Sequence, residues 1–258
     1  MIKLIRLLVK IKIFKRLIPS LIKKIFRLLD IQNIIIKKKE VKLFINLNNP
    51  IDRQIFFKDD YEEEQINYLK HLIKKNNVKR FIDIGAHMGI YSIIISNENI
   101  DVIAFEPYKK SFEQLDANKR LNNFDNLNIN NYALSDKNKK IIMWVPEKEK
   151  SGGMSILDKN DEELKKYKEN DLTKVEAVSM IGDDVLKFER ETLAIKIDVE
   201  RHEHKVLKGI KRLLQKNNVI LQMEIFDKRQ KDIIEYLKEN NFINFHNIKK
   251  DFYFKNFD

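Results

Sequence analysis

Asp83-Ile-Gly85-Ala-His-Met-Gly89 is the stretch of this sequence that decides its fold. An apolar run over residues 78–84 leads into it, and residues 90–97 after it are typical of a helix despite their β-branched members. A strand that turns through glycine into a helix begins an open α/β sheet, and the ligands of such sheets bind at the carboxyl ends of the strands. We therefore predict a ligand pocket at this turn.

The rest of the chain continues as alternating strands and helices. The sequence predicts further strands at 101–106, 127–134, 193–199 and 219–225, helices at 108–122, 203–216 and 228–240, and a closing hairpin at 242–248 and 252–255. Strands that alternate with helices of roughly 10–15 residues indicate a mainly parallel sheet. The predicted fold class is α/β, with a doubly wound, Rossmann-like sheet.

Two regions depart from this alternation. Between the third and fourth strands, residues 139–180 are predicted to be a small β insertion, whose central segment contains Ser151-Gly-Gly153. That segment, with Trp144, suits either a lid over an acceptor or a plain hairpin loop. Upstream, the sequence predicts strands at 41–47 and 53–57 and a helix at 59–74.

The composition excludes several kinds of site. The chain has no Cys among its 258 residues, so it has no disulfide, no Cys-based zinc site and no thiol nucleophile. That suits a reducing compartment, and the expected location is the cytoplasm. Only 6 residues are Gly, so those present are expected to hold special backbone positions.

The net charge of +11 is unevenly distributed. Residues 1–30 hold nine Lys or Arg and one acid, Asp30, which gives +8 and leaves only +3 for the other 228 residues. A nearly balanced core argues against nucleic acid as a partner. With no internal repeat and no Pro/Gly/Ser-rich linker, residues 35–258 are predicted to form one domain that carries an extension, residues 1–34.

The extension is predicted to be a basic amphipathic helical segment. A cation interrupts its apolar runs every few positions, so none approaches the ~20 residues that span a bilayer. Pro19 is expected to divide it into two helices, with Ser20 capping the second over residues 21–29. That second helix would place apolar residues on one face and cations on the other.

Two partners suit this segment. A basic amphipathic helix binds an anionic membrane surface, where each nearby cation adds about 1 kcal/mol, and the protein would then lie peripherally on the inner face of the membrane. The other interpretation is a helix packed on the domain or on a second subunit of a homodimer. Replacing Lys23, Lys24 and Arg27 with Glu would abolish liposome binding only in the first case.

The turn favours S-adenosylmethionine over a dinucleotide. A dinucleotide-binding turn has the pattern G-x-G-x-x-G, whose backbone approaches a pyrophosphate. Here the middle glycine is missing, and Asp83 would repel a pyrophosphate. S-adenosylmethionine has no phosphate and carries an α-ammonium and a sulfonium. Glu106, about 20 residues after the turn, is placed to accept hydrogen bonds from ribose hydroxyls.

With these motifs the sequence resembles the FkbM family of methyltransferases, from about residue 61 to residue 225. The blocks that carry the resemblance are Phe81-Ile-Asp-Ile-Gly-Ala86 with Gly89-Ile-Tyr-Ser92, Ala104-Phe-Glu-Pro107, Asn131-Tyr-Ala-Leu-Ser-Asp136, Ser151-Gly-Gly153, Ile195-Lys-Ile-Asp-Val-Glu200, Glu203, Val206-Leu-Lys-Gly209 and Met223-Glu-Ile225. The resemblance implies a sheet of about seven strands with the last one antiparallel, S-adenosylmethionine as cofactor, and O-methylation of a hydroxyl. The expected acceptor is a sugar, a glycan or a lipid-linked glycan.

The expected cofactor contacts come from these blocks. They are Asp83, Gly85, Ala86, His87, Gly89, Tyr91, Ser92, Glu106, Pro107, Ala133, Ser135, Asp136 and Asp198. Two residues depart from the family pattern, which commonly has Asn at the position of His87 and Gly at the position of Arg201. Glycine there often serves a special turn, so Arg201 is expected either to be strained or to reach a substrate anion.

Methyl transfer to an alcohol needs a base that takes up the hydroxyl proton. Asp198, at the end of the fourth strand, is the first choice for base or acceptor positioning, and Glu200, His202 and Glu224 are the next candidates. The same four residues are compatible with an oxygen-rich Mg²⁺ site, but sequence spacing does not establish that geometry and no metal is predicted.

Two other functions stay open at this point. One is a cofactor-binding or regulatory protein of the same fold that has lost catalysis. The replacement of the usual family Gly by Arg201 supports this alternative. The other is an RNA methyltransferase, which the nearly balanced charge of the core disfavours.

Overall fold

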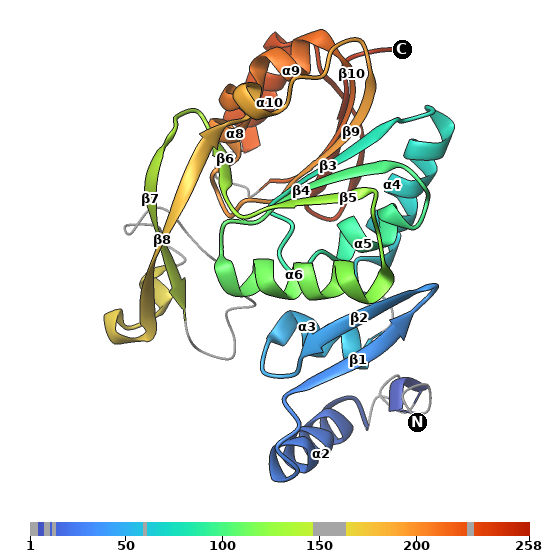
Figure 1. Cartoon of the computed structure of the whole chain (residues 1–258), viewed down its shortest axis with the longest axis vertical. Helices are drawn as coiled ribbons and strands as arrows, with labels where there is room; N and C mark the ends of the chain where they lie inside the picture. The colour runs from blue at the N-terminus through green and yellow to red at the C-terminus, as the bar shows by residue number, and fades with distance from the viewer. Residues whose placement is uncertain (1–4, 8–10, 12–13, 59–60, 147–163, 226–229) are drawn as a thin grey trace.

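The computed structural model describes residues 5–7, 11, 14–58, 61–146, 164–225 and 230–258. Its centre is a seven-stranded sheet of order β11-β12-β10-β9-β3-β4-β5 (Figure 1). Neighbouring strands from β5 to β10 are parallel, and β12 is antiparallel to both β10 and β11. The strands are β3 (Arg80–Ile84), β4 (Asp101–Phe105), β5 (Leu127–Asn130), β9 (Thr192–Ile197), β10 (Asn218–Glu224), β11 (Ile243–Ile248) and β12 (Asp251–Lys255). The predicted α/β sheet with an antiparallel strand is confirmed.

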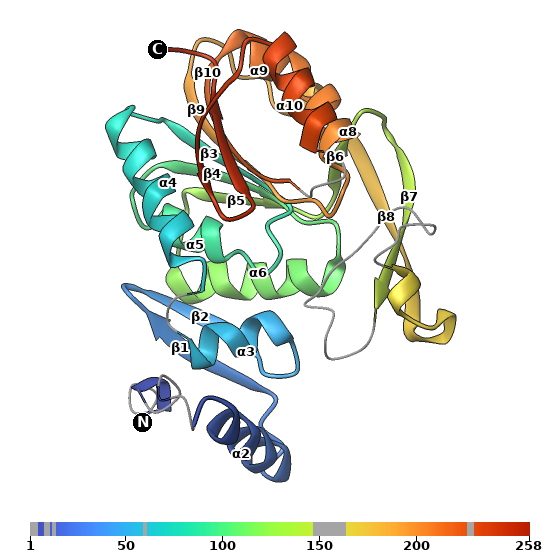
Figure 2. The same ribbon diagram turned by 180° about the vertical axis from the view of Figure 1, so that it is seen from behind.

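Each face of the sheet has its own hydrophobic core, because successive side chains of a strand point to opposite faces. On β3, Phe81 belongs to one core, and Ile82 and Ile84 belong to the other. Helices cover both faces (Figures 1 and 2). The first face carries α4 (Glu63–Lys75), α5 (Ile90–Ser96) and α6 (Lys109–Asn122), and the second carries α8 (Glu203–Gly209), α9 (Lys211–Lys216) and α10 (Gln230–Glu239). The sheet is therefore doubly wound, as predicted.

A small module precedes the sheet and packs on α6. It consists of the antiparallel hairpin β1 (Asn33–Lys38) and β2 (Val41–Asn46) and of α3 (Pro50–Phe57). Asn118 of α6 accepts a hydrogen bond from the Phe44 amide at 2.6 Å and donates one to the Met88 carbonyl at 2.9 Å. This side chain ties the module to the segment that precedes α5.

Residues 53–57 were predicted as a strand, and that prediction is wrong, because they belong to α3. The side chain of Asn49 caps this helix by accepting a hydrogen bond from the Ile51 amide at 2.8 Å, and Pro50 occupies its first turn. The apolar residues that suggested a strand, Ile55, Phe56 and Phe57, are all buried in a short helix. The sequence analysis missed strand β1, and the predicted boundary between residues 34 and 35 lies inside it.

The N-terminal segment contains α2 (Phe14–Leu28), which continues through Pro19. The predicted division into two helices, with Ser20 capping the second, is therefore wrong. A proline inside a helix removes one backbone hydrogen bond. Burial of Ile18, Ile22 and Phe26 against the core of the first face accompanies the continuous helix. No helix of the described residues is both long and apolar enough to cross a membrane.

The predicted β insertion forms a separate sheet of order β6-β8-β7. Its strands are β6 (Ala133–Ser135), β7 (Lys139–Pro146) and β8 (Leu172–Ile181), and the short helices η1 (Leu164–Lys166), η2 (Glu169–Asp171) and α7 (Gly182–Val185) lie around them. A single strand over 127–134 was predicted, which is wrong, because β5 ends at Asn130 and β6 joins the small sheet. Ser151, Gly152 and Gly153 lie outside the described residues.

The single helix predicted over 203–216 is also wrong, since α8 ends at Gly209 and α9 starts at Lys211. A Cβ atom on Gly209 would lie 1.9 Å from the carbonyl oxygen of Ser135. The missing side chain lets the end of α8 contact β6, and this contact brings the small sheet to the edge of the main one.

Candidate functional site

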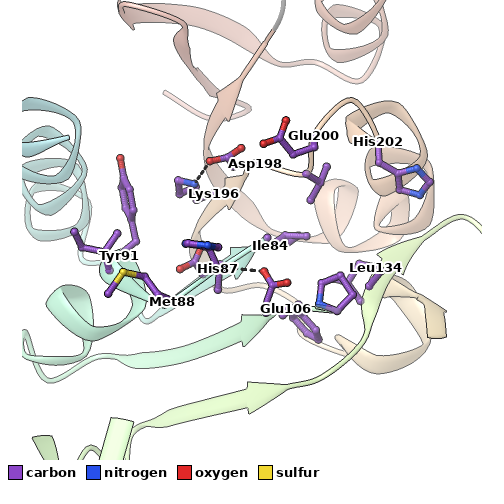
Figure 3. Close-up of a pocket in the computed structure, with 18 of the residues that line it drawn as sticks. Ile84, His87, Met88, Tyr91, Glu106, Leu134, Lys196, Asp198, Glu200 and His202 are labelled. Carbon is purple, nitrogen blue, oxygen red and sulfur yellow. Dashed lines mark hydrogen bonds and ion pairs between the residues drawn. The ribbon is translucent and has the colours of Figure 1, made fainter. Parts of the chain in front are cut away.

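A cavity lies at the carboxyl ends of β3, β4 and β9 (Figure 3). Residues from α3, α5, β6, β7 and the segment before α4 complete its wall. Eleven of the predicted site residues line it: Asp83, Gly85, Ala86, His87, Tyr91, Glu106, Pro107, Ala133, Asp198, Glu200 and His202. Residues far apart in the sequence thus meet at the edge of the sheet where open α/β folds bind their ligands.

The turn after β3 is held close to the neighbouring strands. The amides of Gly85 and Ala86 both donate to the Phe105 carbonyl, at 2.9 and 3.0 Å. Gly85 has φ +85°, and a Cβ atom on it would lie 1.9 Å from the carbonyl oxygen of Asp198. Only glycine fits here, because any other side chain would push the end of β9 away from the turn.

Asp83 lies in the cavity wall with an exposed fraction of 1%. Its Oδ2 accepts a hydrogen bond from the Ser92 hydroxyl at 2.6 Å, and its Oδ1 has no hydrogen-bond partner among the described residues. Burial raises the pKa of Asp83, whereas the charge of Lys196 and the bond from Ser92 lower it. Oδ1 is therefore a buried acceptor that a positively charged donor in the cavity would satisfy. Ser92 holds this carboxyl group in place and does not itself line the cavity.

Glu106 follows β4 and is also buried. Its Oε2 accepts a hydrogen bond from the His87 amide at 2.8 Å (Figure 3). Its Oε1 accepts one from the Tyr108 amide, also at 2.8 Å. Burial raises the pKa of Glu106 to about 7, although the two amide hydrogen bonds oppose that shift. The two amides fix the carboxyl group, and each oxygen keeps a second lone pair for a hydroxyl of a ligand.

Both residues that depart from the family pattern have left-handed backbone. His87 has φ +51° and Arg201 has φ +72°. Glycine adopts such backbone without strain, and Asn and His are enriched there among other residues. His87 therefore replaces the usual Asn at little cost. Arg201 has strained backbone, which is one of the two alternatives that the sequence predicted for it. Burial lowers the pKa of His87 to about 4, so its ring is neutral.

Lys196 is a site residue that the sequence analysis did not single out. It belongs to β9, directly opposite Asp83 of β3, with an exposed fraction of 5%, and its Nζ is 2.9 Å from Oδ2 of Asp198. The same Nζ lies 4.7 Å from the centre of the Tyr91 ring. Burial alone would lower the pKa of Lys196, but the charges of Asp198, Asp83 and Glu62 raise it above its usual range. The sequence did contain a signal for this residue, because a lysine within an otherwise apolar strand is unusual.

Further carboxyl groups surround this lysine. Glu62, before α4, lines the cavity and accepts a hydrogen bond from the Tyr91 hydroxyl; burial raises its pKa. Burial and then the charge of Asp198 raise the pKa of Glu200 to about 8 and that of Glu224 to about 8. Glu200 lines the cavity, and Glu224 does not. The cavity is thus rich in acids around one fixed cation.

The remaining predicted residues lie behind the wall. The Ser135 hydroxyl is 2.9 Å from Nε2 of His202 and 3.2 Å from Oδ1 of Asp136. Neither Ser135 nor Asp136 lines the cavity, and Gly89 begins α5 behind the turn. No group of three or more His, Asp or Glu arranged to hold a metal ion is found among the described residues.

The sequence analysis missed half of the wall. The missed residues are Ile51, Tyr61, Glu62, Ile84, Met88, Ile90, Phe105, Leu134, Met143, Lys196 and Val199. Most are apolar, and apolar residues that line a cavity have the same sequence pattern as core residues. Figure 3 shows Ile84, Met88 and Leu134 beside the polar groups.

The sheet order and this cavity define a Rossmann-like fold of the methyltransferase class. The model of the methyltransferase FkbM domain matches residues 83–243, and the chain belongs to this family of methyltransferases. No curated protein sequence matches the chain.

Solved structures of low sequence identity resemble the chain. The FkbM methyltransferase from Methylobacillus flagellatus KT is 15% identical, with 69% of this chain and 43% of that one covered and a TM-score of 0.45. The Pyrococcus abyssi tRNA (uracil-54, C5)-methyltransferase, in complex with S-adenosyl-L-homocysteine, is 10% identical, with coverage of 87% and 44% and a TM-score of 0.47. The human methyltransferase 10 domain containing protein is 11% identical, with coverage of 92% and 95% and a TM-score of 0.48. The chain spans less than half the length of the first two.

Proposed function

We propose that this chain is an S-adenosylmethionine-dependent O-methyltransferase that acts on a hydroxyl group of a sugar, glycan or glycolipid. The observation that carries the proposal is the pairing of Asp83 and Glu106 in one cavity wall, at the ends of adjacent strands. Asp83 offers a buried oxygen that lacks a partner among the described residues, and Glu106 offers lone pairs on a carboxyl group fixed by two amides.

These residues fit S-adenosylmethionine better than a phosphate-bearing cofactor. Asp83 suits the α-ammonium group, and Glu106 suits the ribose hydroxyls. The acids of the wall outnumber its one lysine, Lys196, which Asp198 already pairs. A pyrophosphate would add negative charge to a wall in which burial and neighbouring acids already raise the pKa of Glu106 and Glu200, which opposes its binding.

When bound, S-adenosylmethionine supplies a methyl group on a positively charged sulfur. Asp198 is our choice for the group that orients the acceptor hydroxyl and takes up its proton. Its side chain is 29% exposed, and the ion pair with Lys196 engages Oδ2, which leaves Oδ1 for the acceptor. Lys196 then acts as a positioning residue, because it fixes the orientation of the Asp198 carboxylate.

Three other candidates fit less well as the base. Glu200 lines the cavity, and its pKa of about 8 means that it holds its proton over much of the neutral range. It is therefore a hydrogen-bond donor to the acceptor below that pH. His202 shares a hydrogen bond with Ser135, which orients its ring. Glu224, outside the wall, would act only through its charge.

The acceptor class follows from the same wall. Acidic and amide groups bind neutral hydroxyls, and Met143 and Leu134 from the small sheet add an apolar surface against which a sugar ring packs. We propose that residues 139–180 act as an acceptor-binding insertion. Trp144 does not line the cavity, in keeping with its position next to Met143 on β7 and the alternation of side chains.

The proposal is tested by binding and turnover measured together. Titration calorimetry with S-adenosylhomocysteine is expected to give binding that Glu106→Ala weakens at least about tenfold, while Glu106→Gln, which keeps the shape, weakens it less. Transfer of labelled methyl to a panel of nucleotide sugars and membrane glycan extracts is then expected.

The competing functions give different results in the same experiment. Binding without transfer to any acceptor would indicate a protein of this fold that has lost catalysis. Transfer to RNA and not to glycans would replace the proposed acceptor. Absence of binding would overturn the proposed cofactor.

A further inference from the structure

Helix α2 has one broad apolar face, and the fold covers only part of it. Ile18, Ile22 and Phe26 pack against the core of the first face of the sheet. The Phe26 ring meets the Phe56 ring edge-on, with the ring centres 5.8 Å apart. Arg6 adds two hydrogen bonds at 3.0 Å to backbone carbonyls of α3. The inner side therefore fixes the orientation of the helix relative to the domain.

The outer side of α2 presents a stripe of exposed apolar side chains. Its members Leu17, Leu21, Ile25 and Leu28 are 61%, 59%, 43% and 86% exposed. Spacings of three and four residues place all four on one side of the helix. Of the twelve large apolar side chains that are exposed among the described residues, nine lie within the first 35 residues. Exposed apolar groups are thus concentrated at one place and are not scattered over the surface.

One cation borders this stripe, and two more lie on the side of α2 that faces the module. Lys24 is exposed beside it, and Lys23 and Arg27 line a depression between α2 and the module, together with Arg53 of α3. Among the described residues that line this depression, Asp30 is the only acid. Residues 1–30 as a whole carry a net charge of +8, against +3 for the remainder of the chain.

We propose that the outer side of α2 docks the protein on an anionic membrane surface, with the helix parallel to the plane of the membrane. The stripe (Leu17, Leu21, Ile25, Leu28) enters the boundary between headgroups and acyl chains, and the exposed Lys24 beside it faces the headgroups. Figures 1 and 2 both show α2 at the opposite end of the molecule from α9, so a flat surface can reach it without meeting the sheet.

The charge favours a membrane over a second copy of the chain. Two copies joined through α2 would bring together two segments that each carry +8, and like charges oppose that contact. An anionic bilayer supplies both the opposite charge and the apolar phase that the stripe needs. This surface is separate from the catalytic cavity, and its test does not depend on methyl transfer.

The test is sedimentation of the full-length protein with two kinds of vesicle, one of equimolar phosphatidylglycerol and phosphatidylcholine and one of phosphatidylcholine alone. The wild type is expected to bind the anionic vesicles more tightly. The double variant Leu21→Asp/Leu28→Asp is expected to bind them about a hundredfold more weakly, since burying each Leu side chain contributes roughly a factor of ten. Ile243→Asp is the matched control, because Ile243 is also an exposed apolar residue, 67% exposed on β11. This variant is expected to bind the vesicles as the wild type does.

The charge has its own pair of variants. Lys24→Glu is expected to weaken binding to anionic vesicles at least about fivefold. Lys211→Glu is the matched control: Lys211 is exposed on α9, and its replacement is expected to leave vesicle binding unchanged. Circular dichroism verifies that each variant is folded. Equal binding by the wild type and the double aspartate variant, or no binding by the wild type, would overturn the proposal. A wild-type dimer that the same double variant converts to a monomer would also overturn it, because a second copy would then cover the stripe.

Discussion

The turn after β3 and the turn after β9 meet at one cavity, and both use left-handed backbone, but they do so with different residues. The first has Gly85, His87 and Gly89 at φ +85°, +51° and +84°, whereas the second has Glu200 and Arg201 at φ +47° and +72° and no glycine. At Gly85 a Cβ atom would overlap the backbone of Asp198. The second turn tolerates side chains, and Glu200 uses its side chain to line the cavity. Sterics therefore fix the residue type at Gly85, whereas His87 of the first turn and Glu200 of the second place side chains in the cavity wall.

The contrast is tested most severely by Gly85→Ala. The added Cβ would overlap backbone, which cannot move aside as a side chain can, so the free energy of unfolding is expected to fall by about 3–5 kcal/mol. Gly89→Ala is the control, because its Cβ would meet the end of the Leu115 side chain, and it is expected to cost less. Urea unfolding measures both, and equal losses would remove the steric basis of the contrast.

Asp198→Asn probes the residue at which the two turns meet. It keeps the shape of the side chain but removes the charge that would take up the acceptor proton, so kcat is expected to fall about a hundredfold or more. The affinity for S-adenosylhomocysteine is expected to stay within about threefold. Glu224→Gln, outside the cavity wall, is expected to change kcat much less. If Asp198→Asn turns over at the wild-type rate, another group is the base.

The buried acids of the two turns predict a dependence of stability on pH. Burial raises the pKa of Glu106 from 4.5 to about 7 and that of Glu200 to about 8. A raised pKa means that the folded state binds the proton more tightly than the unfolded state. This contribution is complete below about pH 4.5 and is lost as the pH rises through about 7 to 8.

The unligated protein is therefore expected to lose stability from about pH 5 to about pH 8, and Glu106→Gln to reduce that slope. Thermal unfolding across this range measures it. The affinity for S-adenosylhomocysteine is expected to change in the opposite direction, since an ionised Glu106 accepts ribose hydroxyls better. A stability that rises with pH over this range would contradict both assignments.

Arg201→Gly has the smallest expected effect, and it tests the strained backbone of the turn after β9. Glycine relieves the left-handed strain, so the protein is expected to gain up to about 1 kcal/mol. Arg190→Gly is a matched control, because Arg190 also has positive φ, at +60°, but is exposed away from the cavity. Both variants are expected to gain stability by urea unfolding. A higher KM for the acceptor in Arg201→Gly alone would show that the Arg201 side chain reaches the acceptor.

The fold was largely predictable because its signals are local. Alternating apolar runs and helical segments mark the strands of the main sheet, and the glycine turn and Glu106 mark the end of the first two. The failures have local explanations as well. An Asn-Pro cap made residues 53–57 helical, and packing of Phe26 on Phe56 accompanied a helix that continues through Pro19.

By itself, the sequence determined the class of sheet, the position of the glycine turn at the cavity and the family, because each depends on residue types at fixed short spacings. Only the tertiary structure showed that Lys196 reaches Asp198, that Glu62 joins the cavity and that Arg201 has strained backbone. It also decided which side of α2 the domain covers and which side stays exposed. The physical reason is that charge pairing and burial depend on distances between segments far apart in the chain.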